Sequence, residues 1–275
     1  MEDITNNNYA PDENQDALNP EPVSPESERA ACGNGEENLA EEVAAKVNAS
    51  VAAEGTEEEG PYVSYRKRGF RYGCYLFVKR LFDIFSSGIA ILLIGWLIVI
   101  FLLVKWMEDW HNPVYVSKRV GKDGKVFKIL KIRTMVPNAE EMKQALIDAG
   151  LNEADPPAFK MKNDPRITRV GKFYRKFSID ELLQLFNIFI GNMSVVGPRS
   201  PIPSEVEQYT QEQMHRLDVK GGLLCLWQIQ KNRNDISFDD WVKFDVEYIK
   251  KQSIWLDMKI IFKGAFMVLF DHSGE

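Results

Sequence analysis

Two adjacent carboxylates, Asp180 and Glu181, are the residues of this sequence best suited to chemistry. They fall in the first turn of a helix predicted from Phe177 to Gly191, where the positive end of the helix favours ionised carboxylates. Two ionised carboxylates at a helix start suit a bound cation, or a nucleophile beside a metal ion. Acidic residues are also ordinary in the first turn of a helix, where they only stabilise it. The pair alone leaves both interpretations open.

Both ends of this predicted helix are marked in the sequence. Ser178 is a suitable N-cap, because its hydroxyl can accept a hydrogen bond from a free backbone N–H of the first turn. Glu181 stands three residues later and completes a Ser-x-x-Glu capping box, so it has a second candidate role. Gly191 suits the left-handed turn that closes a helix. The face predicted to be buried carries apolar residues at helical spacing, namely Leu182, Leu185, Phe186 and Phe189.

Basic residues that could bind phosphate precede this helix. Alternation along a predicted strand places Lys131 and Arg133 on one face, and a spacing of three residues places Arg166 and Arg169 on one face of a predicted helix. Arginine matches phosphate oxygens through two parallel hydrogen bonds. The candidate phosphate contacts before the helix are Lys131, Arg133, Arg166, Arg169 and Arg175. Such a set is also typical of a solvated surface.

Charge is divided unevenly along the 275 residues of the chain. Residues 1–60 contain 16 acidic and two basic residues and one aromatic residue, which predicts a disordered acidic tail. The remainder carries 32 basic and 24 acidic residues. A basic body suggests phosphate-rich partners, namely nucleotide, nucleic acid or anionic lipid. Three widely spaced cysteines indicate neither a disulfide framework nor a zinc site.

An uncharged run of 21 residues, Ile84 to Val104, predicts a membrane segment. As a straight helix it would be about 31 Å long, enough to cross a hydrocarbon core. A basic segment, residues 61–78, precedes the run, and a second basic set follows from Lys118 to Arg133. A single crossing would place the second set outside, whereas an in-and-out hairpin would leave both sets in the cytoplasm. Charge alone leaves both topologies open.

A carboxylate, Asp83, lies at the edge of this run. It is costly there unless it is paired, and Lys79 and Arg80 lie on its own helical face four and three residues earlier. Gly95 is a candidate bend point, because glycine weakens a helix. The expected membrane anchor, residues 79–106, therefore depends on Lys79, Arg80, Asp83 and Gly95.

Residues 107–275 predict an α-rich α+β domain with a small strand component. Alternation and turn residues predict a hairpin of Tyr115–Ser117 and Phe127–Arg133, and a Pro-Arg turn after residue 197 presents Arg199. Leu223 to Ile229 predicts a buried strand. Amphipathic helices are expected at 139–149 and 238–249, and a further helix at 205–216. An apolar helix at 255–270 is expected to lie along a membrane surface.

In this order the motifs resemble those of the bacterial sugar transferase family, the monotopic polyprenyl-phosphate phosphoglycosyl transferases. The resemblance runs from about Tyr75 to the C-terminus. No single motif is specific, but the ordered set is. The motifs are Lys79-Arg80-x-x-Asp83, Arg119-x-Gly121-x-x-Gly124, Lys131-Ile132-Arg133, Ser178-Ile179-Asp180-Glu181-Leu182, Gly197-Pro198-Arg199, Leu226-Trp227-Gln228 and Asp245-x-x-Tyr248.

The resemblance implies transfer of a sugar-1-phosphate from a UDP-sugar to polyprenyl (undecaprenyl) phosphate, with Mg²⁺ and release of UMP. This is the first membrane step of exopolysaccharide, capsule, O-antigen or glycoprotein glycan assembly. By resemblance Asp180 is the nucleophile of a covalent phosphosugar intermediate, Asp180 and Glu181 are the candidate metal ligands, and Arg199 belongs to the nucleotide-side motif. Acid–base work and the helix cap are the alternative roles for Glu181. The family's membrane element is re-entrant, which favours the hairpin topology, with the catalytic domain facing the cytoplasm at the bacterial inner membrane.

The sequence departs from the family pattern at four places, one of which is the second proline of the Pro-Arg-Pro turn, which sits one residue later, at Pro201. Ile94-Gly95 stands where Ser-Pro usually marks the break in the apolar run, Leu183 replaces a proline, and Gly221–Cys225 replaces Pro-Gly-Ile-Thr-Gly. The alternative hypothesis is a non-catalytic adaptor that holds anionic membrane lipid. No nucleic-acid partner is expected, because a basic surface beside a membrane segment needs none to explain it. Downstream membrane glycosyltransferases are further candidate partners.

Overall fold

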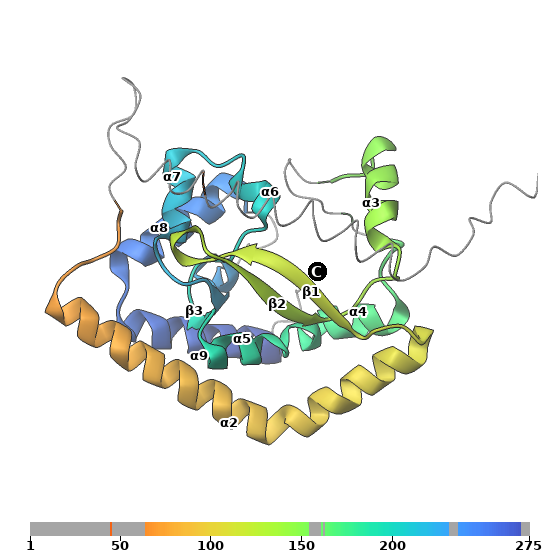
Figure 1. Cartoon of the computed structure of the whole chain (residues 1–275), viewed down its shortest axis with the longest axis horizontal. Helices are drawn as coiled ribbons and strands as arrows, with labels where there is room; N and C mark the ends of the chain where they lie inside the picture. The colour runs from red at the N-terminus through yellow and green to blue at the C-terminus, as the bar shows by residue number, and fades with distance from the viewer. Residues whose placement is uncertain (1–44, 46–63, 154–160, 162, 231–235, 271–275) are drawn as a thin grey trace, which may run out of the picture. The chain divides into compact units, whose positions relative to one another are not determined.

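The computed structural model describes residue 45 and residues 64–153, 161, 163–230 and 236–270, with side chains described as far as 267. All of them belong to one compact unit, residues 40–275 (Figure 1). Apart from Ala45, the predicted disordered tail over 1–60 lies outside the described residues.

The longest element is α2 (Phe70–Asp109), a helix of 40 residues. Its most apolar window has a mean hydropathy of 2.9, so by length and composition it could cross a membrane. Figure 1 shows α2 bent near its middle, with the other elements above it. The helix continues through Gly95, so the change of direction is a bend in one helix rather than a break. Many of its large apolar side chains face solvent, among them Phe85, Leu92, Leu93 and Trp96.

A β-hairpin follows α2. Strands β1 (Val114–Val120) and β2 (Val126–Ile132) pair antiparallel, with Tyr115 opposite Lys131. The short 3₁₀ helix η2 (Lys122–Gly124) joins them. The predicted hairpin is therefore confirmed, because the alternating apolar residues and the Gly-rich turn specify it locally.

Most of the remaining elements are short and helical. In chain order they are α3 (Ala139–Asp148), α4 (Arg169–Lys176), η3 (Ile179–Glu181), α5 (Gln184–Ile190), β3 (Ser194–Val196), α6 (Pro203–Val206), α7 (Gln211–Met214), η4 (His215–Asp218), β4 (Gly222–Leu224), η5 (Trp227–Ile229), α8 (Phe238–Lys251) and α9 (Ile254–Phe270). The predicted helices of 139–149, 238–249 and 255–270 are present as α3, α8 and α9.

Besides the predicted helix of 177–191, which is described with the site, two predicted elements are interrupted. The predicted helix of 205–216 is three short segments, because the N-cap Thr210 starts a new helix with a complete capping box. The predicted strand of 223–229 ends at Leu224, and Trp227–Ile229 form a 3₁₀ turn. Strand β4 pairs in parallel with β3. There Gly222 lies so close to Gly197 that a Cβ on Gly222 would sit 2.0 Å from the Gly197 nitrogen, so no side chain fits.

The N-terminal half of α2 is bound to the body by three charged side chains. The Asp83 carboxylate is buried and accepts hydrogen bonds from Ser194 Oγ (3.1 Å) and the Val195 N–H (2.9 Å) of β3. The expected partners of Asp83 are engaged elsewhere. Lys79 pairs with Asp257 of α9 at 2.8 Å, and Arg80 donates to two carbonyls at the end of α5. The predicted pairing within α2 is thus corrected, because these long side chains reach other elements.

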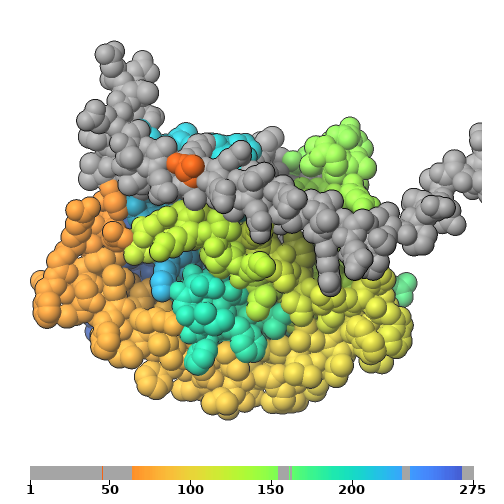
Figure 2. Space-filling view, viewed as in Figure 1, coloured from red at the N-terminus to blue at the C-terminus, as the bar shows by residue number. Residues whose placement is uncertain are grey.

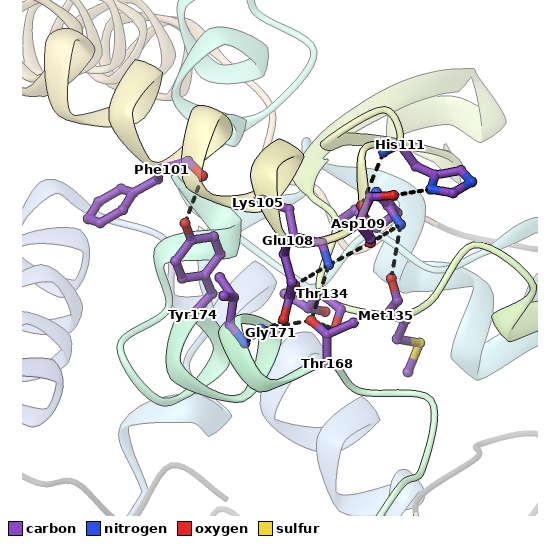
Figure 3. A network of polar contacts seen from close by, with 12 residues as sticks. Phe101, Lys105, Glu108, Asp109, His111, Thr134, Met135, Thr168, Gly171 and Tyr174 are labelled. Carbon is purple, nitrogen blue, oxygen red and sulfur yellow. Dashed lines mark hydrogen bonds and ion pairs between the residues drawn. The ribbon is translucent and has the colours of Figure 1, made fainter.

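The C-terminal half of α2 is bound through a second polar network (Figure 3). Lys105 is fully buried, and its ammonium group contacts Glu108 at 2.6 Å, Asp109 at 3.1 Å and Thr168 Oγ1 at 3.1 Å. The Tyr174 hydroxyl donates to the Phe101 carbonyl at 2.7 Å. Since Thr168 is the N-cap of α4, this network fixes the start of α4 to α2.

Candidate active site

The Asp180–Glu181 pair lies in the 3₁₀ helix η3, not in the first turn of a single helix over 177–191. Ser178 does not cap η3 with its side chain; it adopts the left-handed conformation (φ 54°), and its N–H donates to the Arg175 carbonyl at 3.1 Å. Ser178 therefore closes α4, the role usually filled by glycine. The predicted N-cap and capping box are wrong. The predicted end is confirmed, because Gly191 closes α5 with φ 105°.

Burial on both sides of the pair explains this local structure. Ile179 and Leu183 enter a core cluster with Ile98 of α2, Ile132 of β2 and Tyr174 of α4. The two carboxylates between these apolar anchors are held at the edge of that core, each partly exposed.

The amide side chain of Asn187 fixes α5 to the hairpin. Its Oδ1 accepts from the Leu130 N–H at 3.0 Å, and its Nδ2 donates to the Lys128 carbonyl at 2.7 Å. Asn187 therefore pairs with free backbone groups at the edge of β2, as a neighbouring strand would. These two bonds account for a buried amide among the apolar residues of α5.

Glu181 contacts the hairpin directly. Its Oε1 lies 3.0 Å from the Lys131 ammonium, and about a quarter of the Lys131 side chain and a third of the Glu181 side chain are exposed. The Glu181 carboxylate points to Lys131 rather than back to the Ser178 N–H, so it does not cap the helix, and its role at the metal stays a prediction.

A cavity of about 170 Å³ opens in front of Glu181. We call it the dyad cavity after the Asp180–Glu181 dyad; Glu181 lines it, and Asp180 is the adjacent residue and is not among the lining residues. Three cationic side chains line it, Arg119, Lys131 and Arg199, with Glu181 as the one carboxylate among its described lining residues. Gln184, Ser200, Cys225 and Gln228 also line it. The excess of positive charge favours a polyanionic ligand such as a diphosphate.

Arg119 has a feature that sequence reasoning missed. Its guanidinium donates through Nη1 to the Ser200 carbonyl at 3.1 Å, while its buried Nε finds no hydrogen-bond partner among the described residues. A buried donor without a partner is costly unless a ligand satisfies it. Its motif with Gly121 and Gly124 was visible in the sequence, but nothing there placed Arg119 beside Arg199.

The backbone of Arg199 is held by a buried ion pair. Arg216 donates to Asp245 (Nε to Oδ2, 2.9 Å), to the Tyr209 hydroxyl (2.6 Å) and, at 3.4 Å, to the Arg199 carbonyl. Burial raises the pKa of Asp245 to about 6, and hydrogen bonds and charge from Arg216, with the charge of Arg199, act against that rise. Asp245 was visible as a motif residue, whereas no sequence signal identified Arg216.

The two adjacent carboxylates have pKa values shifted in opposite directions. Burial raises the pKa of Asp180 to about 6; the positive charge of Lys131 opposes this rise and the negative charge of Glu181 adds to it. Burial also acts to raise the pKa of Glu181, but the charge and hydrogen bond of Lys131 and the charge of Arg199 outweigh it, so the net pKa is lowered. Near neutral pH, Glu181 is ionised, and Asp180 is ionised but poorly solvated.

A family model described as bacterial sugar transferase matches residues 74–271. The chain belongs to the bacterial sugar transferase family. A galactosyl transferase, CpsE, of Streptococcus agalactiae is 40% identical over 207 residues, covering 75% of this chain and 45% of that protein. An undecaprenyl-phosphate galactose phosphotransferase of Salmonella typhimurium is 44% identical over 195 residues, covering 70% and 40%.

This sugar transferase chain spans less than half the length of those two relatives. It is closer in size to the exopolysaccharide production protein ExoY of Rhizobium meliloti, which is 38% identical over 187 residues, covering 67% of this chain and 82% of that protein. The family match over residues 74–271 includes Asp180, Glu181 and the cationic residues of the dyad cavity.

The structure brings together some of the residues expected from the sugar transferase pattern. Lys131, Glu181 and Arg199 line the dyad cavity. Arg175 donates to Thr134 Oγ1 at 3.0 Å, and its positive charge opposes the net rise in the pKa of Asp180.

Three other expected phosphate contacts lie elsewhere. Arg133 binds both carboxylate oxygens of Asp109 at 2.7 and 2.9 Å, and Arg166 is buried against Asp164 at 2.7 Å. Arg169 is the exposed first residue of α4, so Arg166, which precedes the helix, does not share a helical face with it as expected. The substrate contacts of these three arginines stay predictions.

The donor set at the dyad fits a magnesium ion that is bound together with substrate. Among the described residues no group of three or more His, Cys, Asp or Glu side chains could hold a metal. Mg²⁺ is typically bound by one or two carboxylates together with water and substrate phosphates, which is what Asp180 and Glu181 could offer.

Proposed function

We propose that this bacterial sugar transferase moves a sugar-1-phosphate from a UDP-sugar to undecaprenyl phosphate and releases UMP. Relatives support the class of reaction, since one of Klebsiella pneumoniae is named a UDP-glucose:undecaprenyl-phosphate glucose-1-phosphate transferase and the Salmonella relative a galactose phosphotransferase. The observation that carries the proposal is the pairing of Asp180, a desolvated carboxylate, with the cationic dyad cavity next to it.

In the first half-reaction the Asp180 carboxylate attacks the phosphorus that carries the sugar. A new bond forms between Asp180 oxygen and phosphorus, the bond to the bridging oxygen breaks, and that oxygen leaves with its electron pair on UMP. Desolvation of Asp180 favours this step, because an ionised carboxylate with little solvent loses less hydration when it attacks. Lys131, Arg119 and Arg199 are placed to stabilise the charge that develops on the phosphate oxygens.

In the second half-reaction an oxygen of undecaprenyl phosphate attacks the same phosphorus. The Asp180–phosphorus bond breaks, the carboxylate is regenerated, and a lipid-linked diphosphate sugar is formed. Asp180 and Glu181, with substrate phosphate, would hold Mg²⁺, which when bound would supply charge neutralisation of the diphosphate. The Lys131 contact holds Glu181 ionised and oriented throughout.

The test is the half-reaction without acceptor lipid. Purified protein with UDP-galactose, chosen because several relatives are named as galactose enzymes, is expected to gain the mass of one hexose phosphate and to release one equivalent of UMP. Asp180→Asn should abolish both signals. Loss of turnover with retained adduct in Asp180→Asn would contradict the nucleophile assignment, and no adduct from a broad panel of UDP-sugars would favour a non-catalytic lipid-binding adaptor.

We also propose that α2 enters and leaves the membrane on the cytoplasmic side. Its bend supports this topology, as do the basic residues on both flanks. Cys74 is exposed and precedes Lys79, so it can report one flank in a Cys32→Ser background. Lys125→Cys, in a background that also carries Cys74→Ser, reports the other flank. Labelling of both from the same side of intact cells is expected, and labelling from opposite sides would show a single crossing.

A further inference from the structure

A second cavity lies beside the N-terminal half of α2, and the proposed reaction does not use it. It holds about 220 Å³ and shares no described lining residue with the dyad cavity. Its walls come from α2, β3, the hairpin turn and the end of α8. Figure 2 shows the surface hollowed between the orange part of α2 and the lime hairpin. We call it the basic cavity.

Cations outnumber carboxylates in the described lining of the basic cavity. The cations are Arg66, Lys79, Arg80, Lys122 and Lys220, and the carboxylates are Asp83 and Asp218. Two carboxylates outside the lining pair with these cations: Asp257 with Lys79, and Asp123 with both Arg66 (3.5 Å) and Lys122 (3.6 Å). Five positive charges thus face four negative charges, an excess of one.

The excess is concentrated at Lys220. The Asp83 carboxylate accepts its hydrogen bonds from β3, and the Arg80 guanidinium donates to carbonyls of α5. Burial and the positive charges of Arg80 and Lys122 lower the pKa of Lys220, against an opposing effect of Asp83. Three cations therefore converge with too little negative charge between them, and a bound anion would relieve their repulsion.

The basic cavity also adjoins apolar surface. Leu76 lines it and is 39% exposed on α2, and the neighbouring Phe77 is 66% exposed. Val219 and Tyr248 add apolar surface inside the cavity. The cavity therefore suits an anion attached to an apolar chain better than a free, fully hydrated anion.

We propose that the basic cavity binds the phosphate of an anionic phospholipid whose acyl chains lie along the N-terminal half of α2. A phosphodiester carries a single negative charge, which matches the excess of one. The acceptor lipid of the proposed reaction has to reach Asp180, so it belongs at the dyad cavity rather than here. The lipid of the basic cavity is thus bound without reacting, next to the strand β3 that leads to Arg199.

The test uses the full chain in detergent and a short-chain phosphatidylglycerol, with native mass spectrometry to count bound lipid over a titration. One phosphatidylglycerol is expected per protein. The double variant Lys122→Ala/Lys220→Ala should weaken binding by about tenfold or more, since charge-assisted hydrogen bonds to phosphate are lost. The matched control is Lys125→Ala, which removes one charge from the same turn, is exposed and does not line the cavity.

Three further ligands identify the occupant. Phosphatidylcholine and inorganic phosphate are expected to bind much more weakly, and undecaprenyl phosphate is expected not to displace the bound phosphatidylglycerol. Equal binding of phosphatidylcholine, equal weakening in Lys125→Ala, or competition by undecaprenyl phosphate would each overturn the assignment. Unfolding temperatures of the variants, measured without lipid, separate loss of the site from loss of the fold.

Discussion

The raised pKa of Asp180 predicts a steep acid limit to the first half-reaction. The nucleophile has to be ionised, and with a pKa of about 6 it is about 90% ionised at pH 7 and only about 10% ionised at pH 5. The rate of UMP release should therefore fall about tenfold between these two values. With an ordinary aspartate pKa near 3.8, the carboxylate would stay more than about 90% ionised at pH 5, and the rate would scarcely change.

The assay is a rapid-quench measurement of UMP formed in a single turnover, with UDP-sugar and no acceptor lipid. Two substitutions should move the midpoint of the pH–rate profile in opposite directions. Glu181→Gln removes a negative charge that raises the pKa of Asp180, so the midpoint should move to lower pH. Lys131→Met removes a positive charge that lowers it, so the midpoint should move to higher pH. Ionisation of the substrate would not respond to these changes in this way.

A rate that stays level from pH 7 to pH 5 would refute the desolvated state of Asp180. A midpoint near 6 that neither substitution moves would refute the attribution to Asp180, because the titrating group would then lie away from Glu181 and Lys131. A smaller burst of UMP with an unchanged midpoint of the pH–rate profile would show that the substitutions change only the fraction of active protein. This result too would refute the attribution to Asp180.

Three further predictions concern single residues. The folded-state pKa of Asp180 lies above the unfolded value, so its ionisation lowers the free energy of unfolding increasingly from about pH 4 to pH 6. Asp180→Asn should therefore raise the unfolding temperature at pH 7.5 and leave it nearly unchanged at pH 4. Ser178→Gly should raise the unfolding temperature, since glycine adopts the left-handed conformation without the Cβ penalty, whereas a decrease would restore the N-cap interpretation. Arg119→Gln should lower kcat/KM by about tenfold to a hundredfold, as for a lost charge-assisted hydrogen bond, and an unchanged kcat/KM in steady-state assays would remove Arg119 from the site.

Local sequence signals predicted what local interactions determine. The hairpin of β1 and β2, the helices α3, α8 and α9 and the left-handed turn at Gly191 follow from periodicity, turn residues and a glycine. The apolar run predicted α2 by length and composition. The candidate residues Lys131 and Glu181 were predicted from local residue patterns and Arg199 from a Pro-Arg turn and the family motif, and the structure places them around one cavity.

Contacts between distant elements account for the errors. Ser178 closes α4 because Ile179 and Leu183 pack into a core formed by α2, β2 and α4. No local sequence motif indicates this packing. Asp83 has near neighbours in its own helix, yet its hydrogen-bond partners are 111 and 112 residues later. Arg133 is likewise taken up by Asp109, 24 residues earlier.

The bonds from Lys79, Arg80 and Asp83 fix the rotation of α2 about its own axis relative to the rest of the unit. Each residue added to a helix advances it by about 1.5 Å and turns it by about 100°. An inserted residue after Asp83 would leave these bonds intact but rotate the apolar half of α2 away from α4, breaking the Lys105 and Tyr174 contacts at the far end. The spacing of 22 residues between Asp83 and Lys105 thus sets the direction in which the apolar face of α2 points relative to the body. A bilayer that contacts this face therefore also orients the body that carries Asp180.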